Sequence, residues 1–576
     1  MRKINDVHIY ILFVLLLIFG LFQLSIFRLY GFSLYPDEFG YWSSAANIVG
    51  YDWSTLASLG SYYSFGYSLL LTPILYIFKG GLAAYRAAIG VNYLLVALSF
   101  VLLSKLSLRI FGGKSDRIKN LLICAVASLY PPLILYSQMT MAESLVTFLF
   151  VLLCYIFAEY LYKPDVIKLV LLVIVALYLY SVHNRTIGVI IALFLAYVFF
   201  GIANKKSRKL TFIMICLAVG AVLIFIILRH RTIGSVFAGA SADDLDINGY
   251  RGQVYKIKHI LSKDGIGDFA IEVLGKLYYL VISTYGMVVF CLISVYNGLR
   301  DMLKGKPGSG RSAIFKLFVV LSTVAEILIS SIFLHLSDRA DVLFYGRYDE
   351  FVAPVLIVMG MYEAYRLLKR GRIDRFIIIS ISTALVLMAP AFLFIRYLKD
   401  KEFPSARGFF ISGIFYLNGF NEYEPSLMVW RAILTGVVLI LVVFVSIWIS
   451  VRIKGGMFLL GLMVVSQILL GYKLSDQWTY RINSYVYTNK VLLDEFKDHP
   501  DKTLYYLDID DNYYVDYIQF EMPKREFKVV TEADLDTIDL KDAYLIVNWS
   551  YPGLDDIKNR YEDYIESDMM FAFYEE

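Results

Sequence analysis

The feature that most constrains this chain is a series of apolar runs, each long enough to cross a membrane as an α-helix. About 20 apolar residues span the hydrocarbon core of a bilayer. Thirteen such runs occur, at approximately 8–29, 84–108, 119–137, 142–161, 166–182, 186–203, 210–228, 276–298, 316–336, 351–367, 376–395, 429–451 and 456–474. Apolar residues make up 59% of the chain and charged residues only 18%, which is too little polar surface for a soluble protein of this size. The sequence predicts an α-helical polytopic membrane protein with about 13 transmembrane helices, and it excludes a soluble enzyme, a disordered chain and a fibrous protein.

The charge of the loops predicts how these spans are oriented. Lysine and arginine gather in alternate connections, at 105–119, 205–209, 300–311, 366–375 and 452–454. The first loop on the other side, 31–64, holds three acidic residues and no basic one. Because basic loops stay in the cytoplasm, we expect a cytoplasmic N-terminus and an extracytoplasmic C-terminus in the plasma membrane. The run 8–29 lacks a small-residue cleavage site and is expected to be an uncleaved first span. The short run 65–78 contains Pro73 and is interpreted as an interfacial or re-entrant helix.

The last hundred residues differ in composition from the rest. Residues 475–576 contain 24 acidic and 10 basic residues, a net charge of −14. Strand-like runs at 503–508, 526–530 and 543–548, with helix-like runs at 512–520 and 554–565, predict a small α/β layer. Three regions follow: a transmembrane core at 1–375 with its first outer loop at 31–83, additional helices at 376–474 with an outer loop at 396–427, and an extracytoplasmic soluble α/β domain at 475–576.

Two adjacent carboxylates, Asp37 and Glu38, lie just outside the first span and directly after Pro36. One interpretation is structural, because acidic residues in the first turn of a helix stabilise its free N–H groups. The other is functional, because further ionisable residues sit at span ends on the same predicted side. These are Glu143, His183, Arg185 and Arg347. A charged group at membrane depth usually faces a cavity or a partner, although a snorkelling side chain or a headgroup contact would also explain each one.

The acidic cluster Asp243, Asp244 and Asp246 is interpreted as a solvated loop face. Together the other residues predict a cavity on the outer leaflet that holds both carboxylates and arginines. Arginine binds phosphate with two parallel hydrogen bonds, and a carboxylate can accept the proton of a hydroxyl group. Because ATP and nucleotide sugars are absent outside the cell, a transferase there needs a donor carried by the membrane, such as a sugar on polyprenyl phosphate.

An ordered set of motifs lies within residues 1–375 on the predicted outer side of the membrane. The motifs are Asp37-Glu38 with Tyr41, the loop helix from Tyr63 to Pro73, Arg86 at the start of the second span, the passage from Leu129 to Glu143, and Tyr345-Gly346-Arg347-Tyr348 with Pro354. This set resembles the GT-C superfamily of integral-membrane glycosyltransferases, and is similar to the protein O-mannosyltransferases and the aminoarabinose transferase of lipid A. No WWDYG-like motif is found, so the resemblance does not extend to asparagine glycosylation.

The resemblance implies a membrane glycosyltransferase that inverts the anomeric centre and uses a polyprenyl-phosphate-linked hexose or pentose. By analogy, Asp37 is the expected catalytic carboxylate, with Glu38 as its neighbour. Residues expected to bind substrate or lipid phosphate are Tyr41, Arg86, Glu143, His183, Arg185, Arg347 and Tyr348. The acceptor would be a glycan, a teichoic polymer, a lipid or a protein of the cell envelope, and no nucleic acid is expected. No metal ligand is assigned, and a divalent cation stays open. Two alternatives also stay open: a transporter or flippase of lipid-linked sugars, and a polymerase or ligase of lipid-linked glycans.

Overall fold

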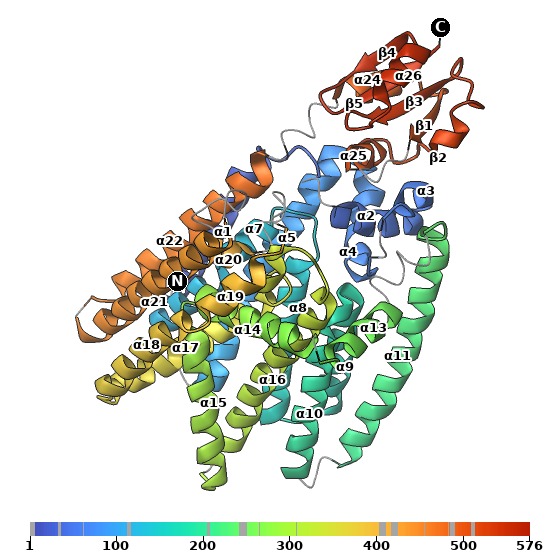
Figure 1. Ribbon diagram of the computed structural model, residues 1–576. Helices are drawn as coiled ribbons and strands as arrows, with labels where there is room; N and C mark the ends of the chain where they lie inside the picture. The colour runs from blue at the N-terminus through green and yellow to red at the C-terminus, as the bar shows by residue number, and fades with distance from the viewer. Residues whose placement is uncertain are drawn as a thin grey trace.

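The computed structural model shows a long body of packed helices with a small α/β domain at one end (Figure 1). It describes residues 6–32, 36–60, 63–111, 117–203, 208–240, 250–263, 265–306, 308–402, 411–415, 424–453, 455–481, 483, 490–507 and 513–575. The acidic cluster predicted as a solvated loop face at 243–246 lies outside these residues, as does half of the predicted outer loop 396–427.

The helices of the body follow one another along the chain with short connections. They are α1 (Asp6–Ile26), α2 (Pro36–Val49), α3 (Ser54–Ala57), α4 (Gly66–Phe78), α5 (Gly81–Phe111), α6 (Arg117–Ser128), α7 (Pro131–Tyr136), α8 (Glu143–Tyr162), α9 (Val166–Val182), α10 (Ile187–Ala203), α11 (Arg208–Val236), α13 (Tyr250–Ile260), α14 (Gly265–Ser283), α15 (Met287–Leu303), α16 (Ser309–Leu334), α17 (Ala353–Lys369), α18 (Ile373–Met388), α19 (Ala391–Leu398), α20 (Ser412–Phe415), α21 (Pro425–Arg452) and α22 (Phe458–Ser475). Short 3₁₀ turns η2 (Asn184–Thr186), η4 (Ala340–Phe344) and η5 (Glu350–Val352) lie between them.

Nine helices in the described part of the chain are long and apolar enough to cross a membrane, or ten if one bent pair counts as a single span. Each of the nine coincides with a predicted run. The other four runs form shorter or broken helices: α1 has 17 apolar residues at Tyr10–Ile26, and α9 has 17 residues. The run 119–137 is split into α6 and α7 ahead of two prolines, and the run 276–298 bends by 98° between α14 and α15. A multi-pass membrane protein is therefore confirmed, while the count of thirteen stays a prediction.

The bend between α14 and α15 has a local cause. Tyr285 and Gly286 adopt left-handed φ angles of 55° and 74°, which end α14 and redirect the chain. The turn packs tightly, because a Cβ on Gly286 would lie 2.8 Å from the Phe444 ring. On the neighbouring helix α17, a Cβ on Gly360 would lie 2.2 Å from the Met287 carbonyl oxygen. Glycine is thus required where α15 and α17 approach each other.

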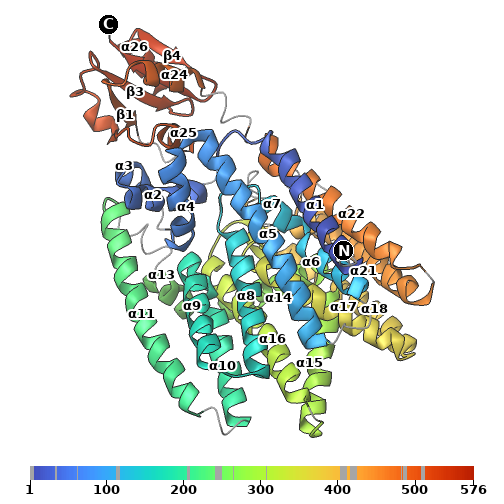
Figure 2. The same ribbon diagram turned by 180° about the vertical axis from the view of Figure 1, so that it is seen from behind.

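The two ends of the helical body carry loops of different charge, as the sequence predicts. The C-terminal ends of α5, α10 and α15, each followed by a lysine- and arginine-rich stretch, point away from the C-terminal domain (Figures 1 and 2). Helices α2, α3 and α4, which belong to the acidic first loop, lie beside that domain. The basic stretches and the acidic loop therefore lie at opposite ends of the molecule. Which end faces the cytoplasm stays a prediction.

The predicted α/β domain is confirmed at the C-terminal end. Its strands β1 (Thr503–Leu507), β2 (Phe527–Val530), β3 (Ala543–Asn548), β4 (Asp563–Glu566) and β5 (Met570–Tyr574) form one sheet in the order β2-β1-β3-β5-β4. The β2-β1-β3 part is parallel, and β5 pairs antiparallel with β3 and β4. Helices α24 (Lys490–Asp498), α25 (Tyr513–Glu521) and α26 (Leu554–Arg560) accompany the sheet.

Three strands and the helix at 512–520 are found where the sequence predicts them. The predicted helix 554–565 is wrong beyond Arg560, because Asp563–Glu566 forms the edge strand β4. The reason is tertiary: β4 pairs with β5, a strand that the sequence analysis did not predict, and β5 places its apolar side chains in the core of the domain.

Candidate active site

A polar cavity of about 130 Å³ lies where α2, the turn between α9 and α10, and the segment after α16 meet. Its lining residues are Asp37, Tyr41, Tyr63, Ser64, His183, Asn184, Arg185, Phe333 and Tyr348. Pro36 is the first residue of α2, as is common where a fixed φ angle suits a helix start, and it puts Asp37 in the first turn. The structure thus brings together five residues that the sequence analysis singled out separately: Asp37, Tyr41, His183, Arg185 and Tyr348.

Asp37 is held by two partners and still faces the cavity. One carboxylate oxygen pairs with the Arg347 guanidinium, and the other accepts a 3.2 Å hydrogen bond from the Tyr63 hydroxyl. Its side chain keeps 22% of its surface exposed, so a substrate in the cavity can reach it. Burial alone would raise the pKa of Asp37, but the positive charge of Arg347 and these hydrogen bonds hold that pKa below its ordinary value. Asp37 is therefore ionised at neutral pH.

Arg347 joins two carboxylates that lie far apart in the sequence. Its Nη2 group donates to Asp37 and its Nε group donates to Glu143, the first residue of α8. The Arg347 side chain is only 3% exposed, so its charge is compensated inside the protein. Burial by itself lowers the pKa of Arg347, but the two carboxylates raise it well above the usual value. The triad formed by Asp37, Arg347 and Glu143 fixes the direction in which the Asp37 carboxylate points.

Glu38 has a different environment from Asp37. One of its carboxylate oxygens accepts hydrogen bonds from the Thr140 amide at 2.7 Å, the Thr140 hydroxyl at 2.8 Å and the Tyr85 hydroxyl at 2.9 Å. The residue is fully buried and does not line the cavity. Successive residues of a helix point about 100° apart, so adjacent carboxylates diverge. The structure assigns Glu38 to the contact between α2 and the segment before α8, and it does not bring this residue to the cavity as its predicted catalytic role requires.

Arg185 lines the same cavity as Asp37. Its guanidinium carbon is 3.4 Å from the centre of the Tyr348 ring and 4.8 Å from that of Phe333. It contacts the His183 ring nitrogen Nε2 at 3.2 Å. Burial, and then the charges of Arg185 and Arg347, lower the pKa of His183 well below its usual value, so the imidazole is neutral and accepts this hydrogen bond. No carboxylate lies within ion-pair distance of Arg185 among the residues that the structure describes.

A smaller cavity of about 20 Å³ shares His183, Arg185 and Tyr348 with the first. Glu143, Arg347, Glu326 and Glu350 line it, and the Tyr136 hydroxyl donates to Glu350 at 2.6 Å. Sequence reasoning did not assign Tyr63, Tyr136, Glu326 or Glu350 to the site. Glu326 carried a usable signal, because a carboxylate in the middle of an apolar run is itself a candidate functional group.

Arg86 is placed apart from these cavities. Its Nε group donates to the Leu29 carbonyl at 3.2 Å, which ties α5 to the end of α1. The structure gives Arg86 this contact and does not bring it to the site.

A large apolar cavity of about 900 Å³ adjoins the polar one, and the two share Asn184 and Phe333. Helices α9, α10, α11, α13 and α16 surround it with aliphatic and aromatic side chains. Among the described residues, its polar lining consists of Tyr180, Asn184, Arg229, His230 and Gln253. The arrangement provides an apolar chamber beside a charged one, which suits an amphipathic ligand.

In the described ranges of the chain, no group of three or more His, Cys, Asp or Glu side chains is arranged to hold a metal ion. Asp37 and Glu143 both direct a carboxylate oxygen at Arg347.

Comparison with solved structures shows which known fold this chain shares. No protein-family model matches the sequence, and a comparison with curated proteins finds no match. The structure is similar over nearly its whole length to the crystal structure of ArnT from Cupriavidus metallidurans bound to undecaprenyl phosphate. The TM-score is 0.54 at 12% identity, covering 98% of this chain and 97% of that one. The apo structure of the same ArnT gives a TM-score of 0.52, covering 99% and 98%. The expected GT-C-like membrane fold is therefore confirmed, and at this identity the likeness concerns the fold alone.

Proposed function

We propose that this protein is an integral-membrane glycosyltransferase that moves a sugar from a polyprenyl-phosphate donor to a hydroxyl group of a cell-envelope acceptor. The observation that carries the proposal is the Asp37 carboxylate, which Arg347 aims into a polar cavity that adjoins an apolar one. The fold supports the choice of donor, since ArnT, with which it is shared, was solved with undecaprenyl phosphate.

The two adjoining cavities suit the two halves of such a donor. The apolar cavity of about 900 Å³ would take isoprenoid units, and the polar cavity would take the phosphate and sugar. Arg185 follows Asn184, which both cavities share, and no described carboxylate lies within ion-pair distance of its guanidinium. We therefore assign the lipid phosphate to Arg185. Arg347, for which the sequence predicts the same role, is engaged by two carboxylates and acts mainly on Asp37.

The chemistry follows from the charges. The ionised Asp37 orients the acceptor hydroxyl and accepts its proton as the oxygen attacks the anomeric carbon. The bond from that carbon to the phosphate oxygen breaks through an oxocarbenium-like state, and the electron pair leaves with the lipid phosphate. Arg185 stabilises the charge that develops on the phosphate. A single displacement of this kind inverts the anomeric centre, and the acceptor is a glycan, a teichoic polymer, a lipid or a protein.

Donor placement is tested by the affinity of the purified protein in nanodiscs for labelled polyprenyl phosphate. Arg185→Lys keeps the charge but loses the planar fork, so affinity should fall about tenfold or more. Ile190→Trp, on the wall of the apolar cavity, should weaken binding by filling space. Arg481→Lys is the matched control, because Arg481 is 74% exposed and lies outside both cavities. Equal affinity in all four proteins would contradict this placement of the donor.

A further inference from the structure

The part of the chain after α22 contacts residues on both sides of Asp37 in the sequence: the stretch that precedes α2, and α2 itself. The first contact is Asn483, which is fully buried. Its amide nitrogen donates to the carbonyl oxygens of Gly31 and Phe32, the latter at 3.0 Å, and its amide oxygen accepts from the Tyr30 N–H. One side chain thus fixes three consecutive backbone positions in the stretch that leads into α2.

The second contact is Phe520 on α25, which is also fully buried. Its ring centre lies 4.6 Å from that of Phe32, 4.9 Å from that of Trp42 and 6.4 Å from that of Trp53. The Trp53 indole N–H also donates to the Pro523 carbonyl at 2.8 Å. The C-terminal domain therefore inserts one aromatic ring among residues that precede, belong to and follow α2.

The backbone approach at this contact is close. A Cβ on Gly80, at the corner between α4 and α5, would lie 2.5 Å from the Phe520 carbonyl oxygen, and Gly80 has a φ of +87°. Glycine is needed there both for the conformation and for the space. The C-terminal domain therefore packs closely against the corner between α4 and α5.

These contacts connect to the carboxylates of α2. Trp42, which touches Phe520, donates its indole N–H to the Thr140 hydroxyl at 3.0 Å, and Thr140 donates to Glu38. Helix α2 is therefore held between the C-terminal domain and the segment before α8. Asp37 lies on the same helix, one residue from Glu38.

We propose that Asn483 and Phe520 are positioning residues, through which the C-terminal domain sets the direction of the Asp37 carboxylate. The proposal rests on the proposed function. A domain that only shielded the site would need to exclude water, and it would not need a buried amide with three hydrogen bonds to the loop before α2. A displacement of about 1 Å at a reacting group can cost about a hundredfold in rate.

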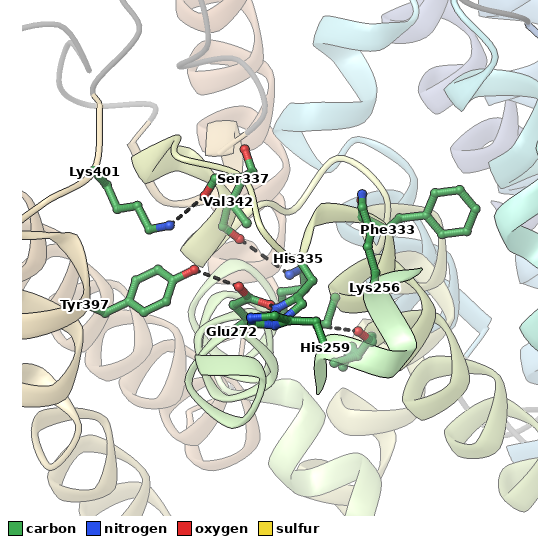
Figure 3. Close-up of polar contacts among 12 residues, drawn as sticks. Lys256, His259, Glu272, Phe333, His335, Ser337, Val342, Tyr397 and Lys401 are labelled. Carbon is green, nitrogen blue, oxygen red and sulfur yellow. Dashed lines mark hydrogen bonds and ion pairs between the residues drawn. The ribbon is translucent and has the colours of Figure 1, made fainter. Parts of the chain in front are cut away.

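A second polar network lies near the C-terminal end of α16. His335 contacts Glu272 at 2.9 Å and His259 at 3.0 Å, and Tyr397 donates to Glu272 at 2.8 Å (Figure 3). Figure 3 shows these side chains directed at one another. The polar groups of these side chains contact one another and join α13, α14 and α19 to the end of α16. This arrangement indicates that the network holds the helices together.

The test combines hydrogen exchange with transfer kinetics on the full-length protein. Phe520→Ala and Asn483→Asp should speed amide exchange in peptides covering 36–49 about tenfold or more. They should also lower kcat about ten- to hundredfold and leave the donor KM within about twofold. Phe520→Leu keeps apolar bulk and should retain most of the activity. The matched control lies inside the C-terminal domain and outside the contact with α2: Phe573→Ala, in the core of the sheet.

The two readouts separate this proposal from the proposed function. Transfer by the wild type, with exchange and kcat in Phe520→Ala and Phe520→Leu no different from those in Phe573→Ala, would overturn the positioning role and leave the transferase in place. Faster exchange in 36–49 without any transfer by the wild type would support the mechanical link and contradict the proposed function.

Discussion

At the scale of single residues, Asp37 and Glu38 show how two adjacent carboxylates come to lie in different environments. Asp37 is partly exposed to a cavity and paired with Arg347, whereas Glu38 is buried and accepts hydrogen bonds from Thr140 and Tyr85. The sequence places both acids outside the first span, but it does not show which one reaches the cavity, because that depends on where α2 packs.

The pH dependence of transfer should report the pairing of Asp37 with Arg347. Because Arg347 lowers the pKa of Asp37, the acid limb of the wild-type kcat profile should lie below the ordinary aspartate pKa of about 3.9. Arg347→Gln removes the charge and leaves the effect of burial, so the limb should move to higher pH. Arg481→Gln serves as control. A raised donor KM with an unmoved limb would instead indicate that Arg347 binds phosphate.

Glu38 should affect stability more than catalysis. Glu38→Gln keeps an acceptor oxygen but adds an N–H₂ group at a fully buried position, where the described partners Thr140 and Tyr85 act as hydrogen-bond donors. The cost should be about 1–3 kcal/mol in the free energy of unfolding. The apparent Tm in detergent should fall, while kcat per folded molecule should change only a few-fold. Glu159→Gln, at a partly exposed ion pair with Arg109, is the comparison. A loss of about a hundredfold in kcat with an unchanged Tm would assign catalysis to Glu38.

At the scale of helices, apolar run length predicts which segments cross the membrane but not where they bend. The run 276–298 reads as one span, yet the chain turns sharply at Tyr285 and Gly286. The turn depends on contacts with α17 and α21, which come later in the chain, so a local pattern cannot show it. The same reason explains why the sequence missed β4 and β5, whose pairing is tertiary.

Close packing of α15 against α17 predicts the effect of one methyl group. Gly360→Ala would place a Cβ 2.2 Å from the Met287 carbonyl oxygen, so the free energy of unfolding should fall by about 1–3 kcal/mol. Gly461→Ala on α22, where a Cβ meets nothing within 4 Å, is the matched control and should be neutral or slightly stabilising. Thermal unfolding of both variants in one detergent gives the comparison. Equal Tm values would contradict the tight contact between α15 and α17.

At the scale of the whole molecule, loop charge and composition anticipate much of the architecture. The acidic tail is a separate α/β domain, and the basic stretches lie at the opposite end of the helical body. The sequence could not show that this domain seats on α2, because the contact between Phe520 and Trp42 joins residues that are 478 positions apart. For the same reason, the sequence shows Arg347 and Asp37 as two separate charged residues and does not show that they pair.

The orientation is tested by accessibility of single cysteines to an impermeant maleimide on intact cells. Ser550→Cys, exposed on the C-terminal domain, should react without lysis. Lys304→Cys, exposed at the far end of α15, should react only after permeabilisation. The background should lack the native cysteines, since Cys216 is exposed. Labelling of Lys304→Cys, and not Ser550→Cys, on intact cells would reverse the predicted topology.

The most direct test of the account is transfer of a labelled sugar from a synthetic polyprenyl-phosphate donor to a cell-envelope acceptor, normalised to folded protein. The wild type should consume the donor and release polyprenyl phosphate. Asp37→Asn keeps the shape and much of the hydrogen bonding but loses the charge, so its rate should fall about 10²–10⁴-fold. Wild-type turnover by Asp37→Asn would contradict the central claim, and so would movement of the donor across a vesicle membrane by the wild type without its consumption.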